Sequence, residues 1–556
     1  MSFVTQPVVA LFLSLAIGYL IGRIRVGPVR VGGVCGTLFV ALALGQLGVT
    51  ISPDLKNVAF ALFIYALGFT AGPQFFNNIR GGLRYGVLSF VEVGTVLVLV
   101  ALAVLLFKLD VGTASGLFAG AATESAVLGT ASDAIGRLAL PAQEISRLQG
   151  NMATAYSVTY LFGLVAIVVF TTQIAPLLLG IDLREAAAAL ARELGDEGDN
   201  GKENGGVPEI VSRAFRAGPI GGGTVGAFEN SVNGVVTIEQ VGRASGFSKA
   251  TPDTRLEADD VVLVIGRRRS VIAISERLGA EVPMPAGDNV PLVERQVVLV
   301  RREVTGLRIR DLRRLAGDEQ RRGVFISRVR RLGQGIPALP GTVLEQGDIL
   351  TLYGSEDAIT RAASELGHLL PVVSATDFVL LGFGVVVGLA LGELAIQVGP
   401  LNLTLGTGGG ALISGLVFGW LHMHRPQFGA IPPAAAEFMK DFGLATFIAA
   451  IGLSVGPDAL ALLKQYGLML PVLAILVSAV PGLISLYIGH HLLKIEAPIL
   501  LGAIAGQHCS TPSISALVSL AGNSTPVIGY TVTYAISNVL LPLMGPVVVG
   551  MVKLIG

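Results

Sequence analysis

The sequence is poor in charge. Of its 556 residues, only 14% are Asp, Glu, Lys or Arg, whereas an ordinary soluble domain has roughly 25%. The 39 basic and 39 acidic residues cancel, which argues against a nucleic-acid partner because such partners require a basic surface. With 52% hydrophobic residues and 72 glycines, the composition predicts a membrane-embedded protein, since glycine lets membrane helices approach closely.

Cysteine is almost absent, and so are the common enzyme motifs. Cys35 and Cys509 both lie in apolar stretches, so they form neither a disulfide framework nor a metal cluster and are interpreted as small buried hydrophobes. A Gly-x-x-x-x-Gly-Lys-Ser/Thr phosphate loop is missing, which leaves ATP-driven pumping unsupported. The match to Gly-x-Ser-x-Gly at 452–456 lies in an apolar run and lacks the strand that a nucleophile elbow needs. We therefore expect no enzyme activity, no cofactor and no metal.

Apolar runs long enough to cross a bilayer, which takes about 20 residues, occur in two sets. They are 6–22, 32–50, 57–77, 86–107 and 150–179, then 376–396, 402–421, 438–457, 467–489 and 526–552. A further stretch in each set, 112–138 and 496–522, is interrupted by polar residues. Because the N-terminus has no basic n-region and no cleavage-site pattern, we expect the first run to be a retained span.

Three motifs recur in the same order in both sets. Residues 63–73 match 447–457, and residues 155–160 match 529–534. Two glycines four residues apart precede Thr-Glu-Ser at 123–125 and Cys-Ser-Thr at 509–511. These matches indicate a duplication.

The basic residues predict the topology. Arginines follow the first and third spans, at positions 23, 25, 30, 80 and 84. An excess of Lys and Arg marks the cytoplasmic side, which places these loops inside and the N-terminus outside. For the charged central insert to lie inside as well, each half must cross the membrane an odd number of times. Five crossings and one re-entrant hairpin per half, at 112–138 and 496–522, meet this condition and make the halves inverted; a discontinuous single span is the alternative.

The predicted fold class is an all-α polytopic membrane protein, an inverted repeat of about five transmembrane helices plus one re-entrant hairpin or broken helix each, with an α+β soluble insert. The predicted domains are a first transmembrane repeat (1–180), a flexible linker (181–206), two strand-rich units (207–285 and 286–373) and a second transmembrane repeat (374–556). The strand-rich units repeat each other, since 253–266 aligns with 341–354.

The interrupted stretches are the main candidate for a functional site. Broken helices at membrane depth occur only where protein or a cavity surrounds them, and in transporters their N-termini point at anionic substrate groups. Ser and Thr that merely join helices are the structural alternative. Glu124 and Asp133 could bind a substrate ammonium or a coupling proton, or pair with Arg80 or Arg137. His508 could titrate near neutrality, or it could be a buried imidazole with satisfied hydrogen bonds. Glu92 could line the pathway, or its side chain could snorkel to the membrane surface. The predicted substrate-binding residues are Thr123, Glu124, Ser125, Asp133, Arg80, Gln507, His508, Ser510, Thr511 and Ser513.

The paired motifs and the insert resemble the aspartate:alanine exchanger family across essentially the whole chain. The two central units resemble RCK C-terminal (TrkA-C) domains through the Leu-x-x-(Asp/Gly)-Asp pattern at 256–260 and 344–348. The resemblance implies electrogenic secondary exchange of L-aspartate for L-alanine, coupled functionally to a cytoplasmic aspartate decarboxylase. It also implies a bacterial inner-membrane location and intramembrane roles for Arg80 and Asp133.

We further expect periplasmic termini, a cytoplasmic insert, alternating access and a homodimer in the lipid bilayer. Two other functions stay open at this point. One is a monovalent-cation or other carboxylate transporter regulated by the RCK_C-like units. The other is a membrane receptor that signals through the insert without transport.

Overall fold

The computed structural model describes residues 3–555 except 27–28, 31, 50, 82, 196–209, 233, 244–245, 284–291, 302, 316–321, 371–374, 399–400, 426–428 and 430. The chain divides into two compact units. The helical unit comprises Met1–Leu190 and Val372–Gly556, and the insert unit comprises Ala191–Pro371.

The first half of the helical unit begins with a short 3₁₀ turn, Phe3–Thr5, and ends with a helix that passes through a π-helical turn, Phe170–Ile174. Its other elements are α1 (Pro7–Gly22), β1 (Arg25–Val26), β2 (Val29–Arg30), α2 (Gly33–Gly45), α3 (Pro53–Gly81), α4 (Leu83–Phe107), α5 (Val111–Ala121), α6 (Ala126–Gly136), α7 (Ala142–Val169) and α8 (Ala175–Leu179).

The second half has the same order of long helices and strand pairs. They are α16 (Phe378–Gly392), β13 (Ala395–Val398), β14 (Leu401–Thr404), α17 (Gly406–His424), α18 (Pro433–Tyr466), α19 (Met469–Tyr487), α20 (Ala497–Gln507), α21 (Thr511–Ala521) and α22 (Thr525–Ile555). The π-helical turn of this half, Ile488–Leu492, however follows α19, the counterpart of α4. The predicted interruptions are therefore real breaks, between α5 and α6 and between α20 and α21.

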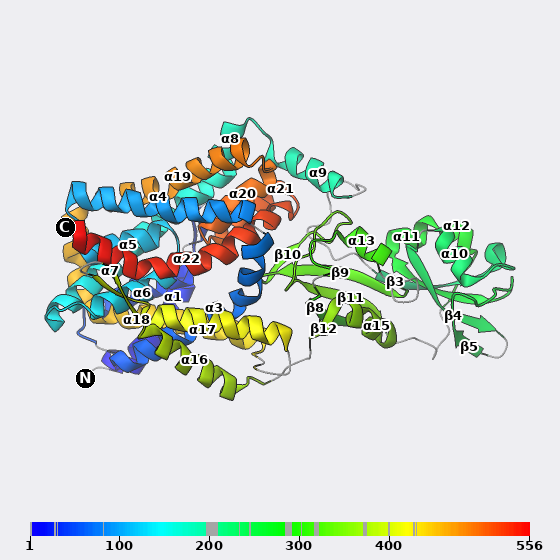
Figure 1. Cartoon of the computed structure of the whole chain (residues 1–556), viewed down its shortest axis with the longest axis horizontal. Coiled ribbons are helices and arrows are strands. Elements are labelled where there is room, and N and C mark those ends of the chain that lie inside the picture. Colours follow the sequence, from blue (N-terminus) through cyan, green and yellow to red (C-terminus); the bar gives the residue numbers. More distant parts are fainter. Residues whose placement is uncertain are drawn as a thin grey trace. The chain divides into compact units, whose positions relative to one another are not determined.

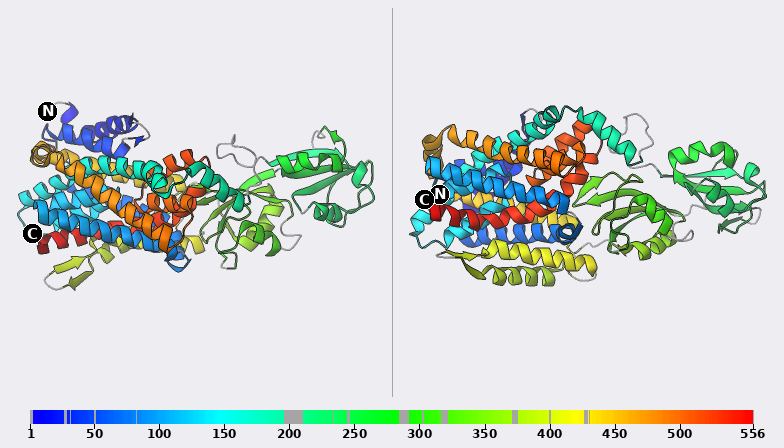
Figure 2. Two further views of the ribbon diagram at one scale, coloured as in Figure 1. Left: turned by 90° about the horizontal axis from the view of Figure 1, so that it is seen from above. Right: turned by 45° about the horizontal axis from the view of Figure 1, so that its top comes forward.

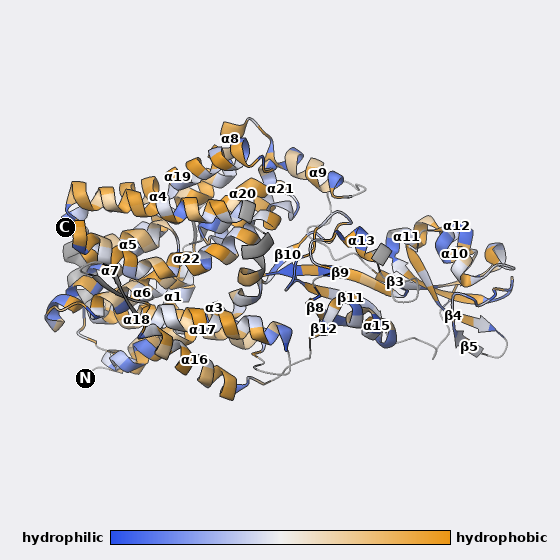
Figure 3. Cartoon of the chain, in the orientation of Figure 1, coloured by the Kyte–Doolittle hydropathy of each residue, from blue (hydrophilic) through white to orange (hydrophobic). Residues whose placement is uncertain are grey.

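Apolar composition separates the helical unit from the insert (Figure 3). Among the described residues, five helices are long and apolar enough to cross a membrane, and six more apolar helices of 10–17 residues accompany them. The five are 53–73, 85–107, 142–179, 469–492 and 525–555. The expectation of a mostly helical protein with several apolar helices and a small two-sheet insert is thus confirmed.

Equivalent helices make equivalent contacts in the two halves. α1 packs on α2 as α16 packs on α17, and α2 contacts α18 as α17 contacts α3. α4 likewise lies beside α22, as α19 lies beside α7 (Figures 1 and 2). The labels of both chain ends lie at the same end of the helical unit. Each half therefore packs against the other in a reciprocal way.

Each break is a hairpin and not a discontinuous span. Along α5 and α7, the Asn151 amide donates to Asp110 (3.0 Å) and the Thr159 hydroxyl donates to the Gly116 carbonyl (3.1 Å). From the first contact to the second, the residue number increases in both helices. α5 and α7 therefore run parallel. α6, which joins them, must therefore run back over the length of α5, about 16 Å.

The second break follows the same rule. A Cβ on Gly502 would overlap the Pro526 carbonyl oxygen, and a Cβ on Gly506 would overlap the Thr533 hydroxyl, so α20 and α22 run parallel at a distance that only glycine permits. α21 is consequently the returning arm of the second hairpin. We call 111–136 the first hairpin and 497–521 the second hairpin.

The insert unit contains two five-stranded antiparallel sheets of identical topology. Their strand orders are β5-β4-β6-β3-β7 and β10-β9-β11-β8-β12. The first repeat is β3 (Ile210–Arg216), α10 (Val225–Ser231), β4 (Val236–Arg243), β5 (Gly246–Lys249), β6 (Val261–Arg267), α11 (Arg268–Ala273), α12 (Ser275–Leu278) and β7 (Glu281–Val282). The second is β8 (Leu292–Leu299), α13 (Ile309–Leu315), β9 (Val324–Arg331), β10 (Gln334–Ile336), β11 (Ile349–Ser355), α15 (Glu356–Leu366) and β12 (Gly367–Leu369). A further helix, α9 (Leu183–Glu193), occupies part of the segment predicted as a linker.

The Asp that recurs in the insert motif forms an ion pair with an arginine in both repeats. In the second, Arg331 binds Asp348 through two 2.7 Å hydrogen bonds, and both side chains are almost fully buried. Burial alone would lower the pKa of Arg331, but the negative charges of Asp348 and Glu345 outweigh it and raise that pKa. In the first, Arg243 binds Asp260 at 3.0 and 3.1 Å, but Arg243 is 41% exposed. Each Asp also accepts the backbone N–H three residues before it, which fixes the turn into β6 or β11.

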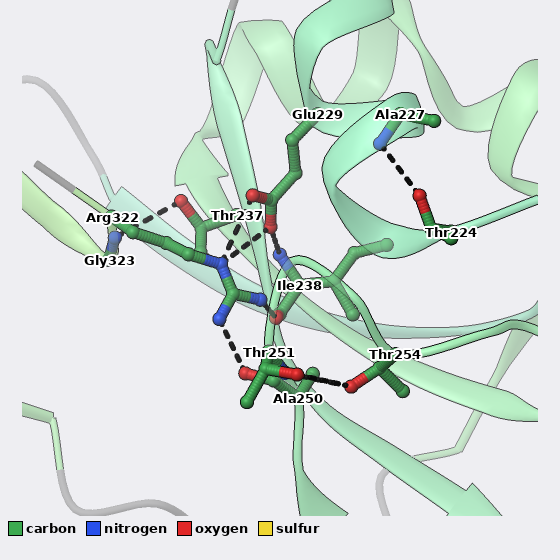
Figure 4. Close-up of polar contacts among 10 residues, drawn as sticks. All are labelled: Thr224, Ala227, Glu229, Thr237, Ile238, Ala250, Thr251, Thr254, Arg322 and Gly323. Atoms are coloured by element: carbon green, nitrogen blue, oxygen red, sulfur yellow. Dashed lines mark hydrogen bonds and ion pairs between the residues drawn. The ribbon is translucent and has the colours of Figure 1, made fainter. Parts of the chain in front are cut away.

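A different arginine, Arg322, joins the two repeats to each other (Figure 4). Arg322, just before β9, extends from the second repeat into the first. There its guanidinium contacts both carboxylate oxygens of Glu229, at 3.1 and 3.3 Å, and donates to the carbonyl oxygens of Ile238 and Ala250. The Gly323 N–H donates to the Thr237 hydroxyl at 3.2 Å.

Candidate functional site

The first arm of the first hairpin ends in a strained left-handed residue. The N–H of Glu124 donates to the Ala119 carbonyl (2.9 Å) and that of Thr123 to the Gly120 carbonyl (3.0 Å), the pattern of a Schellman motif. The position of Thr123 in this motif usually holds glycine, and Thr123 has a φ of 53°. A left-handed conformation costs a non-glycine residue roughly 1–2 kcal/mol, and such strain is concentrated at functional sites.

The second hairpin repeats this geometry residue for residue. The N–H of Ser510 donates to the Ala505 carbonyl (3.1 Å) and that of Cys509 to the Gly506 carbonyl (2.9 Å). Cys509 has a φ of 51°. Cys509 is therefore the counterpart of Thr123, and the plain interpretation of it as a small buried hydrophobe misses its place in the turn.

The two turns meet. The Thr123 hydroxyl donates to the backbone carbonyl of His508, across the two halves of the chain. The Cys509 thiol lies within hydrogen-bonding distance of the Glu124 carboxylate. Thr123, Glu124 and His508 are each at most 7% exposed. We call this contact between the turns at 122–125 and 508–510 the hairpin junction.

Each turn also rests on a tyrosine of the following long helix. The Ser125 and Tyr156 hydroxyls lie 2.6 Å apart, and the Thr511 and Tyr530 hydroxyls lie 3.5 Å apart. A second tyrosine contacts the first one turn further along each helix, with the Tyr156 and Tyr160 rings tilted by 44° and the Tyr530 and Tyr534 rings stacked. These tyrosines belong to the matched motifs 155–160 and 529–534, but the match alone does not connect them with the site.

The amide groups at the hairpin junction are partly bound by the chain itself. The Glu124 carboxylate accepts a hydrogen bond from the Ala126 N–H (3.0 Å) at the start of α6, and the Ser510 hydroxyl accepts one from the Ser513 N–H (3.3 Å) at the start of α21. The carboxylate position predicted for a substrate at α6 is thus occupied by Glu124 in this arrangement.

A buried carboxylate from α4 completes the junction. Glu92 is 0% exposed and accepts a hydrogen bond from the Gln507 amide (2.8 Å), and its other oxygen lies 3.2 Å from His508 Nδ1. The interpretation of Glu92 as a snorkelling side chain is therefore wrong. An acidic residue inside an apolar run was the available signal.

The other predicted site residues differ in their distance from the hairpin junction. The Ser513 hydroxyl lies 2.8 Å from the Thr171 hydroxyl, in the π-helical turn that follows α7, and Thr511, directly after the second turn, is exposed. Asp133 lies near the far end of α6, where it accepts the Thr407 N–H (2.8 Å) at the start of α17 and faces Arg137. The structure does not bring Asp133 to the hairpin junction. Arg80 is in α3, but its side chain lies outside the described residues.

Two sets of apolar helices around a junction of paired, strained helix breaks define a multi-pass membrane permease. The model of a family described as "predicted permease membrane region" matches residues 10–176 and 380–550, which is more than half of the chain. The chain belongs to this family and is a membrane transporter.

Full-length relatives agree with this assignment. The chain is 38% identical to an uncharacterized transporter of Zymomonas mobilis, over 98% of this chain and 97% of the relative. It is 36% identical to an uncharacterized transporter of Bradyrhizobium diazoefficiens (98% and 97% covered) and 36% identical to one of Francisella tularensis (99% and 98% covered). No solved structure matches the chain.

Proposed function

We propose that the protein is a secondary active exchanger that moves L-aspartate against L-alanine by alternating access, with the hairpin junction as its substrate site. The observation that carries this proposal is the meeting of two strained turns, at Thr123 and Cys509, between the two halves. Paired broken elements at the interface of two repeats are the usual location of a transporter's substrate site.

The chemistry of the junction suits a small amino acid. A substrate carboxylate competes with Glu124 for the Ala126 N–H at the start of α6, where the helix dipole favours an anion. The displaced Glu124 carboxylate then faces the substrate ammonium. The hydroxyls of Ser125, Thr511 and the two tyrosines supply hydrogen bonds to the second carboxylate.

The reciprocal contacts of the two halves support an inverted repeat. One hairpin and five crossings in each half put both chain ends on one side, and we propose that this side is periplasmic in a bacterial inner membrane, with the insert cytoplasmic. The two repeats of the insert act as RCK_C-like regulatory units, and the transporter works as a homodimer. A cytoplasmic aspartate decarboxylase supplies the alanine.

Proteoliposomes loaded with L-alanine test the function. We expect uptake of labelled L-aspartate that depends on internal alanine and is accelerated by an inside-positive potential, because aspartate carries one more negative charge than alanine. T123V removes the hydroxyl that links the two turns and should lower the exchange rate at least tenfold. T172V is the matched control, since the Thr172 hydroxyl bonds only within its own helix in the described contacts.

The outcome also separates the other two functions. Sodium or proton flux without any amino acid would favour a cation antiporter. No flux of any kind would favour a receptor. A cysteine at Ser125 that reacts equally fast with and without substrate, measured against the wild-type background, would place the substrate elsewhere.

A further inference from the structure

Buried polar atoms without hydrogen-bond partners are concentrated at one point of the hairpin junction. In the described part of the chain, Glu92 Oε1, Gln507 Oε1 and both ring nitrogens of His508 have no hydrogen-bond partner. All three side chains are 0% exposed. Each such atom costs about 1–3 kcal/mol when buried, so their concentration in one cluster indicates a bound species.

The charge of this cluster identifies the species. His508, with Nδ1 at 3.2 Å, is the ion-pair partner that the described residues provide for Glu92. If His508 is neutral and Glu92 is ionised, a bare carboxylate is buried, which proteins avoid by taking up a proton. One proton on either Glu92 or His508 gives a cluster with no net charge.

Among the side chains that the structure describes around the pair, none supplies the missing positive charge. The titratable groups beside the pair are Cys509 and Glu124 at the turns, and Tyr530 and Tyr534 on α22. α5 carries no titratable side chain, and α19 carries only Tyr487, in its last turn. On α3, Tyr65 packs against Phe418 of α17. Lys56, in the first turn of α3, lies near Asp133 and not at the junction, and the side chains of Arg80 and Arg84 lie outside the described residues. The described groups beside the pair are thus neutral or acidic.

In the described residues, the first half has no histidine as a counterpart of His508 and the second half no acid as a counterpart of Glu92, so the cluster occurs once. Ser478 of α19 stands where α4 has Glu92, ten residues from the start of each helix. Its hydroxyl donates to the Ala121 carbonyl at the end of α5 (2.7 Å), as Glu92 meets Gln507 at the end of α20. The second half thus completes the contact with a neutral hydroxyl, and the protonatable pair is an addition to the duplicated plan.

We propose that Glu92 and His508 form a proton-binding site whose occupation allows the hairpin junction to close. The proton is held by Glu92 Oε1 or His508 Nδ1 and comes from water when the junction is open. It stays bound with either substrate, so the exchange of aspartate for alanine remains electrogenic. This inference rests on the proposed function for its role in transport, but the site itself does not depend on the substrate.

The first test is the pH profile of exchange in proteoliposomes. Loss of the proton at high pH leaves a buried negative charge, so wild-type exchange should fall as the pH rises. E92Q mimics protonated Glu92 and should exchange at a rate independent of pH on the alkaline side. E144Q, which changes an exposed acid paired with Arg147, should keep the wild-type profile. An E92Q profile identical to that of the wild type overturns the proposal.

The second test needs no transport. Infrared difference spectra of the reconstituted protein between low and high pH should contain a band from the pair that disappears in both E92Q and H508Q and stays in E144Q. If the band persists in E92Q and H508Q, the proton site is refuted. If the bands behave as expected but no variant and no wild-type sample exchanges aspartate for alanine, the proton site stands and the proposed substrates are wrong.

Discussion

Replacing Arg322 with alanine should separate the two repeats of the insert. Arg322 and Glu229 have side chains that are only 13% and 12% exposed, so R322A leaves a buried carboxylate without its counter-charge and two carbonyls, Ile238 and Ala250, without their donor. Breaking a buried ion pair by removing one partner costs about 3–5 kcal/mol. We expect the free energy that is needed to open the contact between the repeats to fall by that amount.

The insert offers a matched control for this change. Lys249 and Asp357 also join the two repeats, at 3.0 Å, but their side chains are 57% and 74% exposed. An exposed ion pair contributes about 0.2–1 kcal/mol. K249A should therefore have at most a small effect, although it removes the same charge from the same contact.

Hydrogen–deuterium exchange of the full chain in detergent measures the difference. Since 1.4 kcal/mol corresponds to a factor of ten, R322A should speed exchange of the β4 amides beside Glu229 by about 100-fold or more, whereas K249A should change it by less than about fivefold. E229Q keeps an acceptor for the Ile238 N–H and should give an intermediate value. Equal exchange in R322A and K249A would refute the reasoning that burial, and not charge alone, decides the strength of this contact.

Three further predictions concern single positions. D348N should destabilise the insert by several kcal/mol in thermal unfolding and D260N by less than half as much, because Arg331 is 2% exposed and Arg243 is 41% exposed; equal losses would contradict this. Burial raises the pKa of Glu239 above its ordinary value of 4.5, so the stability that comes from its protonated form is present below that value and is lost as the pH rises. E239Q should accordingly be more stable than the wild type at neutral pH and equally stable in acid. A stability difference that grows as the pH falls would contradict this direction of the pKa shift. G112A should lower the melting temperature of the helical unit and G136A should not, because a Cβ at Gly112 would overlap the Leu148 carbonyl while one at Gly136 would lie 3.8 Å from Gln149.

Local patterns in the sequence predict the helices and the two breaks. The polar interruptions at 123–125 and 509–511 coincide with the ends of α5 and α20, because polar residues and a following N-cap favour a turn inside an apolar run. The matched motifs also predict that both breaks have one geometry. In the insert, the repeated Asp marks the same turn in both repeats.

Contacts between distant segments could not be predicted in this way. Glu92 meets Gln507 across 415 positions of the chain, and hydrophobic periodicity contains no information about such a pairing. The sequence predicts Asp133 near the turn because it shares an apolar run with Thr123, but a hairpin places its second arm antiparallel to the first. Residues late in that arm therefore lie far from the turn. The left-handed Thr123 and Cys509 were also unpredictable, since neither residue type favours that conformation.

The arrangement of the hairpins restricts how the molecule can move. The first arm of each hairpin packs along a long helix of its own half, while the second arm bonds to the long helix of the opposite half, through Thr130 to the Pro542 carbonyl and through Ser513 to Thr171. The Pro542 carbonyl is free for this bond because Pro546, one turn later, has no N–H to donate. The two halves are thereby interlocked, and a motion that separated them would break both hydrogen bonds. A displacement that keeps both bonds must carry the two hairpins together with α7 and α22.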